Sequence, residues 1–337
     1  MAFGQAVSGG IDRRTNLAMA IDLSGGVLCA GNIVYDISVR PVEEIRWGGT
    51  TWVDAIEPHV GGNGANTSIA LAKLKVPVRL LGAVGPDPFG RFAMDALRES
   101  GCDTSRITKA SSPTATTVAL VNAAGLRSFQ HHPGASREVF LAPIPFHSDL
   151  AGKHRHFHLA NIFGLPGLRP HGGETLRRAR AAGLSTSLDT GWDAKGEWMS
   201  VLSGCLPQLD LLFVNEDEAR ALSGHSEPAD AAAFFQDKGV GTVVVKLGAR
   251  GCAVFNQSIH FHVPAFRVEV VDTTGAGDCF AGGFLAGLHV GEDWHGAARW
   301  GNAAGALSTS RLGSTAGLLP RQQFQQFLAT AEINASH

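Results

Sequence analysis

From about residue 150 onward, short apolar runs alternate along this chain with segments of helical periodicity. Three such runs occupy residues 185–189, 211–215 and 242–246, and a similar run at residues 26–31 predicts an earlier strand. Strands that are apolar on both faces are typical of parallel sheets covered by helices on each side. The pattern therefore predicts an α/β fold with a mostly parallel central sheet.

Two earlier regions do not follow this alternation. Residues 37–60 lack helical periodicity and are rich in Val, Ile, Thr and Trp, which favours extended structure. Residues 114–130 predict a hairpin that turns at Ala123–Gly125. We expect both regions to supply strands to a small β-sheet that projects over the main domain as a lid. The domain should span residues 26–330, after a leader at residues 1–25 that need not be ordered.

Composition narrows the partners and the compartment. The formal net charge is −2 and no long basic run occurs, which argues against nucleic acid or an anionic membrane as the main partner. The five cysteines are isolated and odd in number, which argues for a reducing compartment and against a disulfide framework or thiolate metal site. No apolar run is long enough to span a bilayer. We therefore expect a cytoplasmic protein.

Residues 272–278 read DTTGAGD and follow the alternating apolar run Val268–Val271, an order that predicts a strand, a glycine turn and a helix start. Unpaired N–H groups and the helix dipole favour an anion at a helix N-terminus. Gly275 and Gly277 allow positive φ and let a phosphoryl group approach the main chain. With Asp278 beside that spot as a base, the stretch predicts phosphoryl transfer to a hydroxyl. A capping acid on a ligand-free turn is the simpler alternative.

A second glycine turn, GGNGAN at Gly61–Asn66, precedes an apolar-periodic segment that Pro77 ends. Its amides, Asn63 and Asn66, offer donors and acceptors together, which suits the recognition of hydroxyl groups. A glycine turn with an asparagine cap is the alternative interpretation.

Polar residues also follow the predicted strands, at the edge where open α/β sheets bind ligands. Asp36 lies shortly after the first strand and could accept hydrogen bonds from a diol or merely solvate a loop. Asn215 and Glu218 follow a later strand and could hold Mg²⁺ through its waters, although acidic residues at a helix start are common caps.

Other known signatures are missing from the sequence. There is no GxxxxGK[ST] loop and no GxSxG elbow, and neither glycine turn completes GxGxxG. His154, His156 and His158 alternate, which would place them on one strand face without a fourth metal ligand. We interpret them as part of a partly buried strand.

In their order along the chain, these motifs resemble those of the ribokinase-like carbohydrate kinases, the PfkB family. The GGNGAN turn resembles the first signature of the family, and residues 271–284 match the second almost completely. Further segments in family order lie between them at residues 82–90, 133–135, 215–218 and 246–251. The resemblance implies a three-layer α/β/α ribokinase-like fold with a small β-sheet lid, and homodimers formed through that lid.

The resemblance also implies roles for single residues. Asp278 matches the general base that takes a proton from a primary alcohol, and Gly275, Ala276 and Gly277 match the anion hole for the transferring phosphoryl group. The other matches are sugar contacts at Asp36, Gly62 and Asn66; Mg–ATP contacts at Asn215 and Glu218, the latter through water; nucleotide contacts at Lys246, Gly248, Gly251 and Asn302; and part of a monovalent-cation site, usually potassium, at Asp272 and Thr274.

One departure concerns the substrate. Asn63 stands where ribokinases and several phosphosugar kinases carry lysine, and losing that cation weakens the case for a substrate that already carries phosphate. The predicted function is ATP-dependent phosphorylation of a primary hydroxyl of a small sugar, with Mg²⁺ and K⁺. Three alternatives stay open. A nucleoside kinase could stack a base on Trp47 or Trp52, a keto-deoxy sugar acid kinase would need an added Arg or Lys, and a non-catalytic sensor would not need Asp278.

Overall fold

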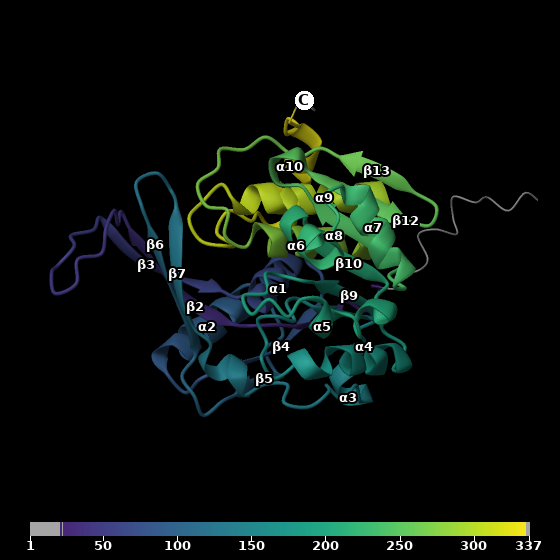
Figure 1. Ribbon diagram of the computed structural model, residues 1–337, viewed down its shortest axis with the longest axis horizontal. Helices are drawn as coiled ribbons and strands as arrows, with labels where there is room; N and C mark the ends of the chain where they lie inside the picture. The colour runs from purple at the N-terminus through teal and green to yellow at the C-terminus, as the bar shows by residue number, and fades with distance from the viewer. Residues whose placement is uncertain (1–20, 22, 335–337) are drawn as a thin grey trace, which may run out of the picture.

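A computed structural model describes residues 21 and 23–334 of the 337-residue chain, and most of the predicted leader lies outside this range. Figure 1 shows an α/β body with a small sheet projecting from one side. The strands of the large sheet are β1 (Val27–Ala30), β4 (Val78–Val84), β5 (Ile107–Lys109), β8 (His156–Leu159), β9 (Ser185–Asp189), β10 (Leu211–Asn215), β11 (Thr242–Lys246), β12 (Cys252–Asn256) and β13 (His260–Val263).

The order of these strands in the sheet is β13-β12-β11-β10-β9-β8-β1-β4-β5. All neighbouring strands are parallel except at one edge, where β12 runs antiparallel to both β11 and β13. The predicted mostly parallel sheet is therefore confirmed. In the register of β1 with β4 and β8, Val27 aligns with Val78 and His156, so the carboxyl ends of these strands meet at one edge of the sheet.

Helices cover both faces of the sheet, as the apolar runs predict. One face packs against α1 (Asn63–Lys73), α2 (Pro88–Glu99), α8 (Ala276–His289), α9 (Trp294–Ser308) and α10 (Arg321–Thr330). The other face packs against α3 (Ser148–Ala151), α4 (Gly172–Ala181), α5 (Met199–Leu202), α6 (Glu216–Ser223) and α7 (Pro228–Asp237). Alternate residues of β1 divide between the two cores, with Val27 and Cys29 in one and Leu28 and Ala30 in the other, because side chains of a strand alternate between faces.

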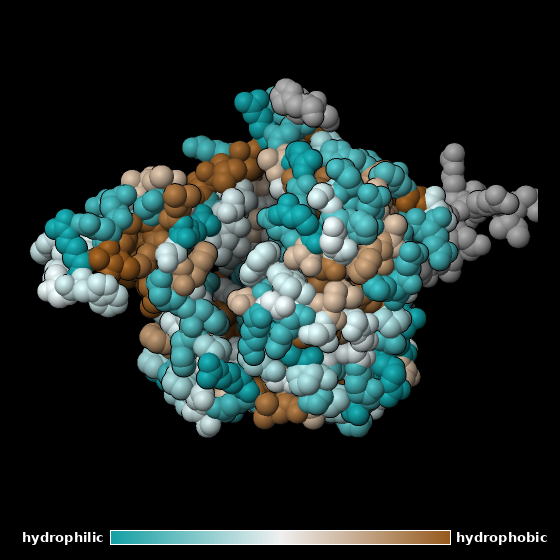
Figure 2. All heavy atoms as spheres, in the orientation of Figure 1, coloured by the Kyte–Doolittle hydropathy of each residue, from teal (hydrophilic) through white to brown (hydrophobic). Residues whose placement is uncertain are grey.

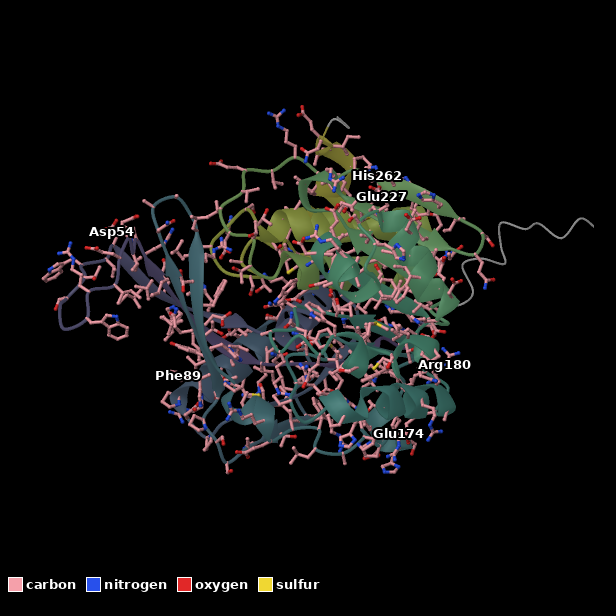
Figure 3. The ribbon with its side chains drawn as sticks, viewed as in Figure 1. Asp54, Phe89, Glu174, Arg180, Glu227 and His262 are labelled. Atoms are coloured by element: carbon pink, nitrogen blue, oxygen red, sulfur yellow. The ribbon has the colours of Figure 1, made fainter. Side chains whose placement is uncertain are left out.

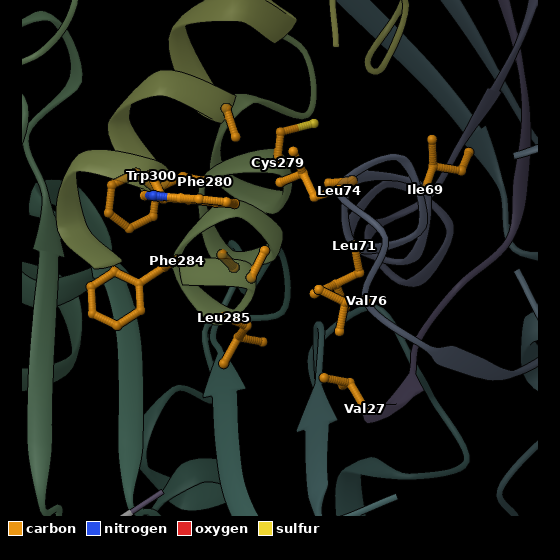
Figure 4. Packing of buried hydrophobic residues seen from close by; sticks show 14 of the residues in the cluster. Val27, Ile69, Leu71, Leu74, Val76, Cys279, Phe280, Phe284, Leu285 and Trp300 are labelled. Atoms are coloured by element: carbon orange, nitrogen blue, oxygen red, sulfur yellow. The ribbon is translucent and has the colours of Figure 1, made fainter. Parts of the chain in front are cut away.

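Helix α8 is the central helix of the first core. Ten of its 14 residues are buried, and Figure 4 shows Leu285 and Cys279 beside Leu71 and Leu74 from the C-terminal end of α1. Glycines let its neighbours approach closely: a Cβ on Gly282 would lie 2.7 Å from the Cβ of Ala70. The N-terminus of α8 is thus held firmly in place by tight packing.

The small sheet has the strand order β3-β2-β6-β7, with bounds β2 (Val34–Arg40), β3 (Ala55–Gly61), β6 (Ala115–Val121) and β7 (Arg127–His132). Both regions that the sequence assigns to a lid supply its strands. The hairpin of β6 and β7 turns through Gly125, whose φ of 79° requires glycine. The loop of residues 41–54 extends from the far end of this sheet, where Figure 3 places Asp54.

One predicted strand is wrong. Residues 268–271 form no strand, and the side chains of Val270 and Val271 are 61% and 49% exposed. The N–H groups of Val271 and Asp272 both donate to the carbonyl of Thr309, so this segment is anchored to the end of α9 instead of a neighbouring strand. The alternating valines therefore belong to a surface segment, and their side chains line cavities. Across the described ranges, no helix is both long and apolar enough to cross a membrane.

Candidate active site

Asp278 lies in the first turn of α8, where asparagines from α1 hold its carboxylate. Nδ2 of Asn63 donates to Oδ1 at 2.7 Å, and Nδ2 of Asn66 donates to Oδ2 at 2.8 Å. Both amides are oriented from behind, because Oδ1 of Asn63 accepts from Asn161 and Oδ1 of Asn66 accepts from Ser314. The NH₂ groups therefore face Asp278 and favour its ionised form, which only accepts hydrogen bonds.

Burial acts on Asp278 in the opposite direction. The residue is only 7% exposed, and this desolvation raises the pKa of its carboxyl group. The hydrogen bonds from Asn66 and Asn63 and the charge of Lys246 partly oppose the rise. A carboxylate held in place with a raised pKa is suited to accept a proton near neutral pH.

The N-terminus of α8 forms a wall between two cavities. A cavity of about 720 Å³ lies under the small sheet, and we call it the lid cavity. Figure 2 shows the surface hollowed where the small sheet meets the body. The predicted residues that line the lid cavity are Asp36, Gly62, Asn63, Asn66, Asp272, Thr274, Gly275 and Asp278.

The second cavity, of about 410 Å³, lies on the other side of this wall, and we call it the Lys246 cavity. The predicted residues that line it are Lys246, Gly248, Gly251, Ala276, Gly277 and Asn302. Apolar side chains, including Phe266 and Val268, complete the lining. A base and a phosphate tail could share a cavity of this mixed character.

Two glycines keep the wall thin. Gly275 is the N-cap of α8 with φ of 73°, and a Cβ there would lie 2.6 Å from the Cβ of Ser314. A Cβ on Gly277 would lie 3.1 Å from Nζ of Lys246. The backbone between the cavities is therefore bare, as the approach of a phosphoryl group to main-chain N–H groups requires.

Lys246 ends β11 beside this wall, in a buried ion pair that the sequence does not indicate. Its Nζ donates to both oxygens of Asp189, at 2.8 and 2.6 Å. Burial alone would lower the pKa of Lys246, but the charges of Asp189 and Glu218 raise it, so the ammonium group stays charged. Asp189 and Lys246 end β9 and β11, which flank β10 on either side, and their shared place at the carboxyl edge of the sheet is the signal that could have paired them.

Asn215 and Glu218 form a helix cap, the alternative that the sequence left open. Oδ1 of Asn215 accepts from the N–H of Glu218, and Oε2 of Glu218 accepts from the N–H of Asn215 and from Oγ1 of Thr190. Neither residue lines either cavity. Within the described residues, no group of three or more His, Cys, Asp or Glu side chains could hold a metal ion directly.

Asp36 lies on β2 of the small sheet and not in a loop after β1, so its place in the lid was not predicted. Burial raises the pKa of Asp36 to about 6, a hydrogen bond from Thr117 opposes the rise, and the charges of Asp272 and Asp278 add to it.

The amide of Asn302, expected to contact the nucleotide, already has partners within the protein. Its Nδ2 donates to the carbonyls of Val263 and Pro264 beside the Lys246 cavity.

The positions of two tryptophans and three histidines bear on further expectations from the sequence. Trp47 and Trp52 are 94% and 92% exposed on the outer loop and line neither cavity, so the base-stacking role foreseen for them is wrong. His156 and His158 are fully buried on β8, where both contact Ser187 at 2.7 Å. His154 precedes that strand, and desolvation lowers the pKa of both strand histidines, which stay neutral.

Asn32 and Arg127 belong to the site but were missed from the sequence. Asn32 is 7% exposed and lines the lid cavity, and its Oδ1 has no hydrogen-bond partner among the described residues. It comes two positions after β1, the kind of place that carries ligand contacts. Arg127 contacts the expected cation-site residues: its guanidinium lies 3.0 Å from Oδ1 of Asp272 and from Oγ1 of Thr274.

Comparison with known proteins agrees with this geometry. The model of the pfkB family carbohydrate kinases matches residues 26–321, nearly the whole described chain. The chain belongs to the PfkB family. The expected ribokinase-like membership is thereby confirmed, and with it the class of carbohydrate kinases.

Individual PfkB relatives cover most of the chain. The chain is 31% identical to the aminoimidazole riboside kinase of Salmonella typhimurium, over 81% of this chain and 89% of that protein. It is 29% identical to the fructokinase of Vibrio alginolyticus, over 80% and 91%. The structure of Arabidopsis thaliana ribokinase complexed with ribose and ATP superposes with a TM-score of 0.79 at 26% identity, covering 90% of this chain and 99% of that one. The ribokinase-like fold, with its small separate sheet, is thus confirmed.

Proposed function

We propose that this PfkB kinase transfers the γ-phosphoryl group of ATP to a primary hydroxyl of a small sugar. The observation that carries the proposal is the shared wall: Gly275 and Asp278 line the lid cavity, while Ala276 and Gly277 line the Lys246 cavity. A sugar on one side and a triphosphate on the other would meet at the N-terminus of α8.

In this reaction the sugar hydroxyl attacks the γ-phosphorus, and the bond from that phosphorus to the bridging oxygen of ADP breaks. Asp278 accepts the hydroxyl proton, so the products are ADP and a sugar phosphate. The N–H groups of the α8 N-terminus and the Lys246 ammonium group stabilise charge on the transferring group. Asp36, Gly62, Asn63 and Asn66 hold the sugar hydroxyls, and the unpartnered Oδ1 of Asn32 offers one more acceptor.

Fewer contacts of the structure support the proposed cofactor sites. Mg²⁺ would neutralise the nucleotide phosphates, and Glu218 would hold it through water, with Asn215 beside it. Gly248, Gly251 and Asn302 would shape the nucleotide end of the Lys246 cavity. Potassium would bind at Asp272 and Thr274, although Arg127 already contacts both side chains. Assays of activity with and without K⁺ test this prediction.

A nucleoside is the second candidate substrate. Phe129 and His131 of β7 line the lid cavity, where they could pack against a base. A cavity of about 720 Å³ also has room for more than a monosaccharide. A keto-deoxy sugar acid is less favoured, because the two arginines of this cavity, Arg40 and Arg127, already pair with Glu57 and Asp272.

Assembly and location complete the proposal. Exposed apolar side chains on the outer loop, Ile45, Trp47 and Trp52, support a homodimer formed through the lid sheet. All five cysteines are buried free thiols, which supports a cytoplasmic location.

The test is ADP release measured over ribose, fructose, nucleosides and keto-deoxy sugars, with Asp278→Asn beside the unaltered protein. We expect sugar-dependent ADP release that falls by about 10²–10⁴-fold in the variant. Asp95→Asn, on the exposed face of α2, is the control and should keep full activity. A variant at position 278 with normal turnover would refute the proposed base, and absence of any sugar-dependent ADP release would leave the sensor alternative.

A further inference from the structure

Arg127, the first residue of β7, links the small sheet to the wall between the cavities. Its Nη2 lies 3.0 Å from Oδ1 of Asp272, and its Nη1 donates to Oγ1 of Thr274 at 3.0 Å and of Thr273 at 3.3 Å. One guanidinium from the lid sheet thus contacts three consecutive residues that lead directly into Gly275 and the start of α8.

This contact is more than a surface ion pair. The side chains of Arg127 and Asp272 are 18% and 8% exposed, so solvent screens their attraction less than that of an exposed pair. The planar guanidinium reaches the carboxylate and the hydroxyls together, a geometry that a lysine ammonium cannot reproduce. The link is therefore directional as well as charged.

Asp272 is itself fixed to the body of the protein. Its Oδ2 accepts from the N–H of Gly313, its Oδ1 accepts from the N–H of Thr274, and its own N–H donates to Thr309. Arg127 therefore joins a projecting sheet to a rigid point. Because Thr274 directly precedes Gly275, Arg127 connects the position of the lid to the conformation of the phosphate turn. It acts beside a second link, in which Oγ of Ser314 donates to the carbonyl of Val60 on β3.

We propose that Arg127 is a positioning residue that couples closure of the lid sheet to the geometry of the phosphate turn. With the guanidinium engaged, the Gly275 turn is held and the lid cavity is covered at the edge beside Thr274. Without it, water reaches the wall more easily and the turn loses a restraint. This inference rests on the proposed kinase function and adds a residue that does not touch the reacting atoms.

The matched variants are Arg127→Met, which keeps the length of the side chain but removes its charge, and Arg127→Lys, which keeps the charge but not the fork. Arg46→Ala is the control, because Arg46 lies on the outer loop of the same sheet and pairs only with Glu44 among the described residues. The measurements are kcat, the KM of each substrate, and the ratio of ADP released to sugar phosphate formed.

We expect Arg127→Met to lose on the order of tenfold or more in kcat, since small misplacements of reacting groups are costly. We also expect ADP to exceed sugar phosphate, because water then competes with the sugar. The kcat and product ratio of Arg127→Lys should lie between those of Arg127→Met and the unaltered protein. Those of Arg46→Ala should match the unaltered protein. Normal kcat and a one-to-one product ratio in Arg127→Met would overturn the inference, as would a loss of kcat without any change in that ratio.

A second measurement does not depend on activity. Hydrogen exchange of the unliganded protein should become faster in residues 115–132 and at the start of α8 in Arg127→Met, and stay unchanged there in Arg46→Ala. Unchanged exchange in both regions would overturn the coupling even if no sugar were ever found. Failure of the proposed function shows instead as an unaltered protein that releases no ADP with any sugar.

Discussion

Asn63 and Asp278 are separated by 215 positions in sequence, yet Nδ2 of the one donates to Oδ1 of the other at 2.7 Å. The two glycine turns of the chain therefore meet at a single carboxylate. Asn63, which stands where related glycine turns carry lysine, is also the residue that holds the proposed base.

Replacement of Asn63 by alanine tests this contact. Burial already raises the pKa of Asp278, and Asn63 is one of the groups that oppose the rise, so its loss should raise the pKa further. Because the base must be deprotonated to act, the acid limb of the kcat profile should move to higher pH. Hydrogen bonds to charged groups contribute about 1.5–3 kcal/mol, so we expect a loss of roughly tenfold or more in kcat at pH 7.

The pH dependence of kcat between pH 5 and 9 is the measurement for Asn63→Ala. Asn161→Ala, which removes the donor behind Asn63, should shift the limb in the same direction by less. An unmoved acid limb in both variants would show that Asn63 does not tune the base.

Asp36 should lower the stability of the folded protein while it contributes to sugar binding. Its folded-state pKa of about 6 exceeds the ordinary 3.8, so the folded protein binds a proton more tightly than the unfolded chain. The free energy of unfolding therefore falls as pH rises from about 4 to 6, and the ionised carboxylate destabilises the protein at pH 7. Asp36→Asn should stabilise the unliganded protein by on the order of 1–3 kcal/mol at pH 7.5.

The same substitution should raise the sugar KM by about tenfold or more, because a charged acceptor is lost. Melting temperatures at pH 4 and 7.5 separate the two effects, since the gain should shrink as the pH approaches 4. An unchanged or lower melting temperature at pH 7.5 in Asp36→Asn would contradict the raised pKa.

Gly277→Ala tests the bare wall without backbone strain, because Gly277 lies within helix α8 and is absent from the glycines of positive φ. Its new methyl group would meet only the flexible end of Lys246, at 3.1 Å, so the fold should tolerate it. We expect the ATP KM to rise and kcat to fall by roughly 10–100-fold, with little change in the sugar KM.

Gly49→Ala on the outer loop is the matched control for Gly277→Ala, because its Cβ would make ordinary contact with Arg46. Steady-state kinetics in both substrates, with melting temperatures, provide the check. Normal ATP kinetics in Gly277→Ala would place the phosphate tail elsewhere.

The ion pair of Lys246 and Asp189 predicts non-additive stability. Lys246→Met leaves a buried carboxylate without its partner, which typically costs about 3–5 kcal/mol. Adding Asp189→Asn removes that charge, so the double variant should be more stable than Lys246→Met alone. Urea unfolding of the two single variants and the double variant measures the coupling. Strictly additive changes would mean that the two side chains do not stabilise each other.

The sequence was sufficient for the main sheet and for the two glycine turns that meet at Asp278, but not for the links between distant segments. The runs ending at Asn215 and Lys246 formed β10 and β11 with those bounds, because an apolar run buried on both faces leaves few alternatives. The valines at 268–271 have a strand-like period but no neighbouring strand to pair with, and period alone does not reveal this.

The same limit explains what was missed in the site. The glycine turns were visible because glycine and acid spacing is local information. Asp189 and Arg127 act through partners that lie 57 and 147 positions away, at Lys246 and Thr274, and only the folded chain brings these together. The capping box of Asn215 and Glu218 was visible as an alternative, and a ligand role for it stays a prediction.

The burial of α8 determines where motion can occur during turnover. A helix enclosed at ten of 14 positions cannot shift without breaking contacts with α1 and α9 at once. Adaptation to substrates of different size must therefore fall on the four-stranded sheet, which extends from the body into solvent. Evolution of a new sugar preference in this scaffold would then be expected in β2, β6 and β7, while the phosphate end stays constant.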